Sequence, residues 1–342
     1  MKRRDFLLNT SLGLAGALAV PQFLSKYDIV LGHNNKRYRI NTRWSQADVS
    51  RFPVNDCHEM VQDQKGRLLL LTNETRNNVL IYDKNGKLLD AWGTVYPGAH
   101  GLTLFNENGT DVLFICDNNR HQVIKTTIDG KVLMTLDYPR ETGLYGKAEE
   151  YIPTETAIAP NGDIYVADGY GKDFIIQYDP QGRYIRHFGG RGEGAEHLFN
   201  AHGVCVDLRD KANPCLVVSS RQQYAFKRYD LAGNYLSTIA LPGAWVCRPV
   251  IQGNYLYAAV LQSNRQLWKE SGFVTILDKQ NKVISNPAGS EPTYTDGLPV
   301  EMYQTINAFQ YPHDVCVDDE ENLYVAQWNS GKTYPYKLEP VP

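Results

Sequence analysis

Four of the eight histidines occupy the second position of short apolar segments that recur along the chain. Imidazole nitrogens are common ligands of zinc and related metals, and three such ligands leave a fourth coordination position open for a substrate. The histidines could therefore build a catalytic metal site if the fold brings them together. They are His58, His100, His202 and His313, and Thr154 and Arg248 hold the same position in two further segments.

Each of these segments begins a unit of several short predicted strands, which is most complete between residues 151 and 206. Turns such as Pro160-Asn161-Gly162 and Asp179-Pro180-Gln181-Gly182 separate four apolar runs there, as in a meander of antiparallel hairpins. The six aligned positions lie 42, 54, 48, 46 and 65 residues apart. A period of about 40–50 residues with four strands per unit is typical of a β-propeller. Six starts predict six blades in an all-β fold.

The first strand of each propeller blade lines the central channel, so the six aligned residues should form a ring. His100, His202 and His313 fall on alternate blades, which lie about 120° apart in a six-bladed ring. We therefore expect these three to bind one transition metal, most simply zinc, with His58 nearer the periphery. The alternative is that each histidine only satisfies backbone groups at the start of its strand.

The predicted last blade ends near Leu338 after three strands. The segment from Lys36 to Ile40 alternates polar and apolar residues and could supply the fourth strand. This N-to-C strand clasp would close the ring and remove an exposed sheet edge. The sequence thus predicts one propeller domain over residues 36–342.

The N-terminus has the composition of an export signal. Arg3-Arg4 followed by Phe6-Leu7 matches the twin-arginine pattern, and the apolar run from Leu12 to Val20 is too short for the roughly 20 residues that span a bilayer. We expect a signal peptide over residues 1–25 and a periplasmic or extracellular protein, with a retained anchor as the alternative. No stable membrane insertion is expected after signal cleavage.

Composition narrows the range of partners. The formal net charge of -3 argues against the clustered basic face that nucleic-acid binding requires. We expect a monomer that takes a small-molecule or peptide substrate. The six cysteines occur at equivalent strand positions, such as Cys205 and Cys316, which favours buried free thiols and few or no disulfides.

Several motifs are similar to one known family, the peptidyl-α-hydroxyglycine α-amidating lyases, which are six-bladed propellers related to the NHL-repeat proteins. The resemblance covers roughly residues 53–338. It rests on Ala99-His100-Gly101-Leu102, Asp117–Lys125, Val166-Ala167-Asp168-Gly169-Tyr170, His202 and Tyr311-Pro312-His313-Asp314.

The resemblance implies roles for individual residues. Three histidines hold zinc in that family, and the matching positions are His100, His202 and His313. The family's proposed general base matches Tyr170, and an arginine that stabilises the reacting oxygen matches Arg221. A structural calcium, held by one carboxylate and backbone carbonyls, would map to Asp314, Leu102 and Met60.

The sequence also departs from the family pattern at positions that bind the substrate in that family. In that family an arginine binds the substrate carboxylate, and the matching position in this sequence is Asn73, with Arg76 three residues later. A methionine that lines the channel in the family is replaced by Tyr311. Arg248 is an additional channel residue. We expect these four residues to contact the substrate.

Three functions follow from these features. The first is an exported metal-dependent lyase that cleaves a C–N bond in a carbinolamide-type substrate, with Tyr170 as base and Arg221 stabilising negative charge. The second is a metal-dependent hydrolase or lactonase on the same fold. The third is a non-catalytic NHL-type binding scaffold, which gives no reason for histidines to align on alternate blades.

Overall fold

The repeating unit is built from short strands joined by turns that need glycine. In the third unit, β11 (Glu155–Ile158), β12 (Ile164–Ala167), β13 (Phe174–Tyr178) and β14 (Tyr184–Gly189) pair in sequence order as an antiparallel sheet. Gly162 and Gly182 take positive φ values of 89° and 78° in the intervening turns, a conformation that costs glycine little. The outermost strand, β14, carries the exposed residues of the unit, whereas β12 is buried throughout.

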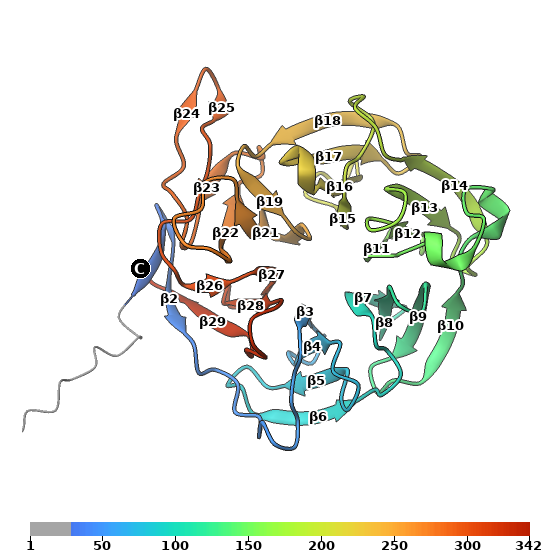
Figure 1. Cartoon of the computed structure of the whole chain (residues 1–342), viewed down its shortest axis with the longest axis horizontal. Coiled ribbons are helices and arrows are strands. Elements are labelled where there is room, and N and C mark those ends of the chain that lie inside the picture. The colour runs from blue at the N-terminus through green and yellow to red at the C-terminus, as the bar shows by residue number, and fades with distance from the viewer. Residues whose placement is uncertain (1–28) are drawn as a thin grey trace, which may run out of the picture.

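Six such units form a closed ring in the computed structural model, which describes residues 29–342 (Figure 1). The predicted six-bladed β-propeller is confirmed. Blade one contains β3 (Cys57–Gln62), β4 (Leu68–Thr72), β5 (Val79–Tyr82) and β6 (Leu88–Trp92). Blade two contains β7 (Ala99–Glu107), β8 (Thr110–Asp117), β9 (Gln122–Thr127) and β10 (Val132–Leu136). Blade four contains β15 (Ala201–Asp207), β16 (Cys215–Ser220), β17 (Ala225–Asp230) and β18 (Tyr235–Ala240).

Blade five departs from the pattern in two ways. Its inner strand is interrupted, because β19 (Ala244–Val246) and β20 (Val250–Gln252) both pair with β21 (Tyr255–Ser263) and leave a gap between them. After β22 (Ser271–Leu277) and β23 (Val283–Ser285), a small hairpin of β24 (Tyr294–Thr295) and β25 (Leu298–Pro299) projects beyond the ring (Figure 1). The strand β26 (Phe309–Gln310) then pairs with β22 and leads into blade six.

Blade six closes the ring with strands from both ends of the described chain. β27 (Pro312–Val317), β28 (Leu323–Gln327) and β29 (Tyr336–Pro340) are followed in the sheet by β2 (Lys36–Asn41), with Ile40 opposite Leu338. The predicted strand clasp is present. The sheet also contains β1 (Val30–His33), so the expected domain start at residue 36 is too late. Leu31 is buried, and the His33 amide donates to Ser285 Oγ of blade five, which explains why this strand belongs to the ring.

The apolar core lies between adjacent blades. Leu69, Leu71 and Ile81 of blade one pack against Leu102 and Ile115 of blade two, and similar buried clusters lie between the later blades. Burying each such side chain contributes about 1.5–3 kcal/mol. The packing fixes each inner strand relative to its neighbours, and so fixes the residues that line the channel.

Other segments complete the description. Three 3₁₀ turns, η2 (Arg140–Thr142), η3 (Ala148–Glu150) and η4 (Arg221–Gln223), are the helical elements of residues 29–342. Across that range, no helix has the length and apolar character needed to cross a membrane. All six cysteines lie within the described part of the chain as free thiols. The predicted signal peptide falls outside the described residues.

Candidate metal and catalytic site

The four aligned histidines meet in the channel. Ring centroids are 4.9 Å apart for His58–His100, His58–His313 and His100–His202, and 4.8 Å apart for His202–His313. All four side chains are buried. The predicted shared register therefore produces a compact cluster, and His58 belongs to it rather than lying at the periphery as expected.

A repeated irregularity in the ladders turns these side chains inward. In β3, Cys57 pairs with Thr72 and Glu59 with Leu71, which leaves His58 as an extra residue. The pairings of β7, β15 and β27 shift in the same way around His100, His202 and His313. Bulges of this kind bend a strand locally and re-aim a side chain. Four blades thus use one device to point a histidine into the channel.

Hydrogen bonds settle the protonation of two rings. His100 Nδ1 lies 2.9 Å from the carbonyl oxygen of Thr154, and His313 Nδ1 lies 3.0 Å from the carbonyl oxygen of His58. A carbonyl oxygen can only accept, so in both rings Nδ1 carries the proton and Nε2 keeps a lone pair. Metal-binding histidines are typically oriented by this kind of partner.

The electrostatics favour neutral rings. Burial lowers the pKa of His58 to about 3, and burial is also the main cause that lowers the pKa of His100, His202 and His313 well below the ordinary value. Neutral imidazole is the form that binds a metal.

The donor set fits a transition metal. Ring nitrogens of His58, His100 and His313 all lie within 4.8 Å of one another. Nδ1 of His58 and of His202 is buried with no hydrogen-bond partner among residues 29–342. Nitrogen donors of this type suit zinc, copper, nickel or iron.

Tyr170 reaches the cluster from a tight turn after β12. Its hydroxyl lies 3.1 Å from Nε2 of both His100 and His202, although the side chain as a whole remains 38% exposed. The turn is held by Asp168, whose carboxylate accepts from the Ile152 amide at 2.7 Å and the Tyr145 hydroxyl at 2.7 Å. A side chain at Gly169 would collide with the Ala201 carbonyl, so glycine is required there.

Arg221 lies beside this group. It begins η4, is buried, and donates from Nη2 to Cys247 Sγ at 3.2 Å, while Nε has no hydrogen-bond partner within the described chain. Burial raises the pKa of Tyr170, and the positive charge of Arg221 opposes that effect. Tyr170 therefore lies at the histidine cluster with Arg221 next to it.

A cavity of about 300 Å³ opens over the cluster. Asn118, Asn119 and Trp328 line it and were missed in the sequence analysis. Each follows the second strand of its blade, as Tyr170 and Arg221 do, so this position was the signal that could have identified them. The full lining is His58, Asn73, Pro97, Gly98, Ala99, His100, Asn118, Asn119, Tyr170 and Trp328.

Three of the predicted substrate-binding residues have different positions relative to this cavity. Asn73 lines it, but its amide already bonds to Asp56 and Asn55. The side chain of Arg76 is 61% exposed, pairs with Glu74 and is absent from the lining. Tyr311 packs edge-on against Trp328 with centroids 5.5 Å apart, and so borders the cavity through that residue.

Arg248, the fourth predicted substrate-binding residue, does not line the cavity over the histidines. Its guanidinium is buried among Asp314, the Met60 carbonyl and the Leu102 carbonyl, and its side chain is 10% exposed. Arg248 lies in the gap between β19 and β20, beside Pro249, which has no amide hydrogen to continue the ladder. Its side chain therefore does not follow the register of the histidines.

The same contacts engage the ligands of the predicted calcium site. The three expected ligands, the Asp314 carboxylate and the Leu102 and Met60 carbonyls, all accept hydrogen bonds from Arg248. A guanidinium and a calcium ion cannot share these oxygens. The residues present do not fit a bound calcium.

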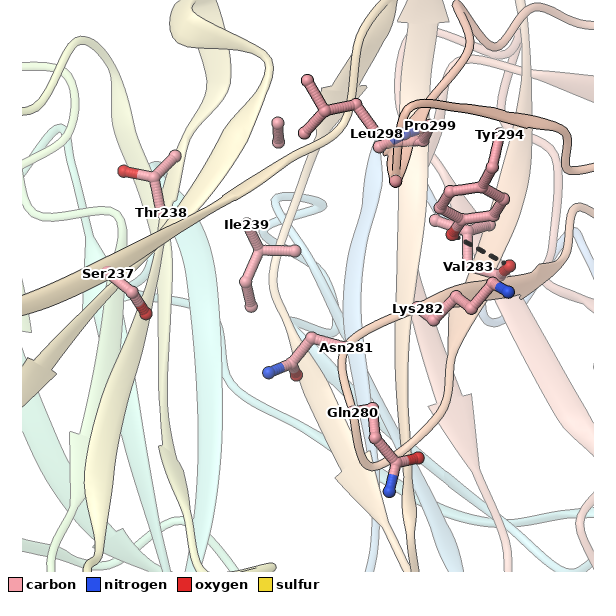
Figure 2. Close-up of a pocket in the computed structure, with 12 residues that line it drawn as sticks. Ser237, Thr238, Ile239, Gln280, Asn281, Lys282, Val283, Tyr294, Leu298 and Pro299 are labelled. Carbon is pink, nitrogen blue, oxygen red and sulfur yellow. Dashed lines mark hydrogen bonds between the residues drawn. The ribbon is translucent and has the colours of Figure 1, made fainter.

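A larger cavity lies away from this chemistry. It measures about 520 Å³ and separates the outer strand β18 from the β24–β25 hairpin, with Tyr294 and Lys282 on one side (Figure 2). Its lining contains no histidine, cysteine or carboxylate among the described residues. This outer groove therefore offers no metal ligands, and the smaller cavity over the histidines is the candidate site.

Comparisons with known proteins agree with the fold. A family described as "6-bladed beta-propeller" matches residues 157–292. A solved structure of a gluconolactonase from Xanthomonas campestris superposes with a TM-score of 0.58 at 13% identity, covering 92% of this chain and 98% of that chain. At this identity the likeness concerns the fold alone.

Two curated relatives are similar in sequence. A probable peptidyl-alpha-hydroxyglycine alpha-amidating lyase of Caenorhabditis elegans is 31% identical over 157 residues, which cover 45% of this chain and 40% of that protein. Peptidyl-alpha-hydroxyglycine alpha-amidating lyase 1 of Drosophila melanogaster is 29% identical over 360 residues, covering 94% of this chain and 57% of that protein. The chain spans about half the length of these relatives.

Proposed function

We propose that this protein is a metal-dependent lyase that cleaves the C–N bond of a carbinolamide-type substrate. The observation that carries the proposal is the Tyr170 hydroxyl, which lies 3.1 Å from two ring nitrogens of the four-histidine cluster at the floor of an open cavity. This arrangement combines a candidate acid–base group with a candidate metal site. The names of the two curated relatives support the same class of reaction.

The reaction needs no water and no oxidant. A carbinolamide carries a hydroxyl and an amide nitrogen on one carbon. Loss of the hydroxyl proton turns the C–O bond into a carbonyl as the C–N bond breaks, and the departing nitrogen takes up a proton. One residue that accepts the first proton and returns it to the nitrogen is sufficient for the proton balance.

The histidine cluster would hold zinc or another divalent transition ion, which would supply Lewis acidity at the substrate oxygen. The chain itself fixes the rings for this purpose. His100 and His313 are each held through Nδ1 by a backbone carbonyl, so their Nε2 lone pairs face the channel.

Tyr170 is the candidate base. A phenol ordinarily titrates near pH 10, and burial here raises its pKa further. Arg221 favours the ionised phenol, and the same charge would stabilise an anionic oxygen as it forms on the substrate. The Asp168 carboxylate fixes the turn that carries Tyr170, because it accepts from the Lys172 amide at the end of the turn and from the Ile152 amide in the segment before β11.

The other residues that line the cavity over the histidines indicate the charge of the substrate. None of the described residues that line the cavity is Lys or Arg. The neutral amides of Asn118 and Asn119 and the indole of Trp328 can contact peptide groups or a flat apolar surface. We therefore expect a substrate whose group next to the reacting carbon is neutral rather than a free carboxylate.

A substrate panel tests the proposal. Metal-loaded protein is incubated with a peptide that ends in α-hydroxyglycine, with the α-hydroxyglycinamide form of the same peptide, and with a set of lactones. The proposal expects an aldehyde product, glyoxylate or glyoxylamide, released together with the peptide amide. Lactone hydrolysis without aldehyde release would instead support a metal-dependent hydrolase and overturn the lyase assignment.

A further inference from the structure

Below the histidine cluster, one arginine occupies the centre of the channel. The Asp314 carboxylate accepts from Arg248 Nε at 3.0 Å and from Nη2 at 2.8 Å. The Leu102 carbonyl accepts from Nη1 at 3.1 Å, and the Met60 carbonyl accepts from Nη2 at 2.9 Å. Such a two-pronged carboxylate contact is the strongest geometry available to arginine.

The contacts of this arginine reach across the ring. Met60 belongs to blade one, Leu102 to blade two and Asp314 to blade six. Two further carboxylates, Glu59 of blade one and Glu155 of blade three, lie 3.7 Å and 3.6 Å from Arg248 Nε. Arg248 itself comes from blade five, so five blades meet at one guanidinium.

Blade four contributes a glycine, Gly203, that leaves room for the backbone of Arg248. A Cβ on Gly203 would lie 2.5 Å from the Arg248 Cα, which is closer than packed atoms allow. Gly203 follows His202 directly, so the glycine lets the arginine backbone approach the inner strand of blade four. All six inner strands are therefore adapted to this group.

The carboxylates also hold the neighbouring backbone. Glu59 Oε2 accepts from the Leu102 amide at 2.6 Å, and Asp314 Oδ2 accepts from the Met60 amide at 2.9 Å. Met60 and Leu102 are thus fixed through both N–H and C=O. Each lies two residues after a histidine of the cluster, so the arginine network holds the strand backbone next to His58 and His100.

The oxygen set around Arg248 is one that a hard cation would bind. Three carboxylates and two backbone carbonyls converge, and these are the ligand types that calcium prefers. We infer that Arg248 is a built-in cation that takes the place of a bound calcium ion at the centre of the channel. The closed ring of this propeller consequently does not depend on calcium, and removal of the guanidinium opens a latent calcium site.

An ordinary buried ion pair would behave differently. Breaking such a pair leaves an uncompensated charge and costs stability that an added ion does not restore. If the inference holds, calcium should restore the stability that is lost when the Arg248 guanidinium is removed, because the oxygens that bonded to it are already arranged around one point. It does not depend on catalysis, so its failure would leave the proposed function untouched.

The test compares wild type, Arg248→Ala and a matched control in metal-depleted buffer, with and without millimolar calcium. Arg209→Ala is the control, since the Arg209 side chain is only 6% exposed and pairs with Asp207 at 2.6 Å, the one carboxylate among residues 29–342 with which it forms an ion pair. Thermal unfolding and calcium titration calorimetry are measured for each protein. Expression and refolding of Arg248→Ala are carried out in both buffers.

Wild type should bind no calcium and keep its Tm within about 1 °C on calcium addition. Arg248→Ala should lose on the order of 10 °C in Tm without calcium, regain most of it with calcium, and bind one ion per chain. Arg209→Ala should show no calcium-dependent gain. Folding of Arg248→Ala only when calcium is present also supports the inference.

Two results would overturn it. One is saturable calcium binding by wild type that disappears in Asp314→Asn, which would show that Arg248 leaves the site open to the ion. The other is an Arg248→Ala variant that is unstable or unfolded to the same extent with and without calcium.

Discussion

Tyr170 differs from the many other tyrosines of this chain in what its hydroxyl meets. Tyr145, for example, donates to the Asp168 carboxylate, and the Tyr165 hydroxyl donates to a backbone carbonyl. The Tyr170 hydroxyl instead faces two imidazole nitrogens at the floor of a cavity. A side chain placed in this way can exchange a proton with a substrate, whereas the hydroxyls of Tyr145 and Tyr165 are used in bonds within the protein.

The histidine cluster leads to a prediction of metal content. Purified protein should carry about one equivalent of zinc or a related ion, because ring nitrogens of the buried His58, His100 and His313 lie within 4.8 Å of one another and the His202 ring packs against that of His313 at 4.8 Å. His202→Ala should lose most of the metal, measured by elemental analysis. His187→Ala is the control, since that ring lies on β14 and bonds to Tyr184. Full occupancy in a His100→Ala, His202→Ala, His313→Ala triple variant would disprove the metal site.

A second prediction concerns the cavity over the histidines, whose described lining contains no Lys or Arg. Asn118→Arg should raise kcat/KM for the α-hydroxyglycine peptide by about tenfold relative to the α-hydroxyglycinamide peptide, because a cation at short range attracts a carboxylate. Asn118→Gln keeps the amide and serves as the neutral control. An unchanged preference in Asn118→Arg would mean that the substrate carboxyl end does not reach this part of the cavity.

At the scale of elements, the turn after β12 links stability to the placement of Tyr170. Burial raises the pKa of Asp168 to about 6. A carboxyl whose folded pKa is raised binds more protons in the folded state than in the unfolded state between pH 3.8 and 6, so its contribution to stability grows as the pH falls.

Asp168→Asn should remove this dependence. Between pH 7 and pH 5, wild type should gain about 1 kcal/mol of unfolding free energy relative to Asp168→Asn, measured by denaturant titration. The variant should also lower kcat, because an amide cannot accept hydrogen bonds at both of its polar atoms as the carboxylate does at Ile152 and Lys172. Parallel pH profiles for the two proteins would show that Asp168 does not titrate in this range.

The inner strands also show what the sequence could and could not predict. The period of the apolar segments was enough to place His58, His100, His202 and His313 on one ring, because β-propeller blades repeat the same register. The register alone does not say which way a side chain points at a bulge, so His58 was expected too far out. The sequence also did not reveal that Arg248, in the break between β19 and β20, bonds to Asp314 and to two backbone carbonyls.

At the scale of the whole molecule, ring closure depends on segments far apart in sequence. The clasp of β2 with β29 was predictable because the last blade lacked a strand and Lys36–Ile40 had an alternating pattern. The added strand β1 was not, because its buried residue Leu31 is anchored through contacts with blade five that no local pattern reveals.

The cysteines give a prediction for the whole chain. We propose export by the twin-arginine route, which moves folded protein, so thiols buried before export should remain reduced in an oxidising compartment. Five of the six are buried and Cys205 is partly buried. Alkylation under denaturing conditions followed by intact-mass measurement should therefore count six free thiols with and without prior reduction. Two or three bridges would contradict either the export route or the buried placement of these residues.

The central claim is that Tyr170 performs acid–base chemistry next to a histidine-bound metal, and turnover by metal-loaded Tyr170→Phe tests it most directly. Phenylalanine keeps the ring and its packing and removes only the hydroxyl. Aldehyde release should fall about 10²–10⁴-fold in kcat while metal content and Tm match those of wild type. Aldehyde release by Tyr170→Phe at the wild-type rate, with the metal still bound, would contradict the account.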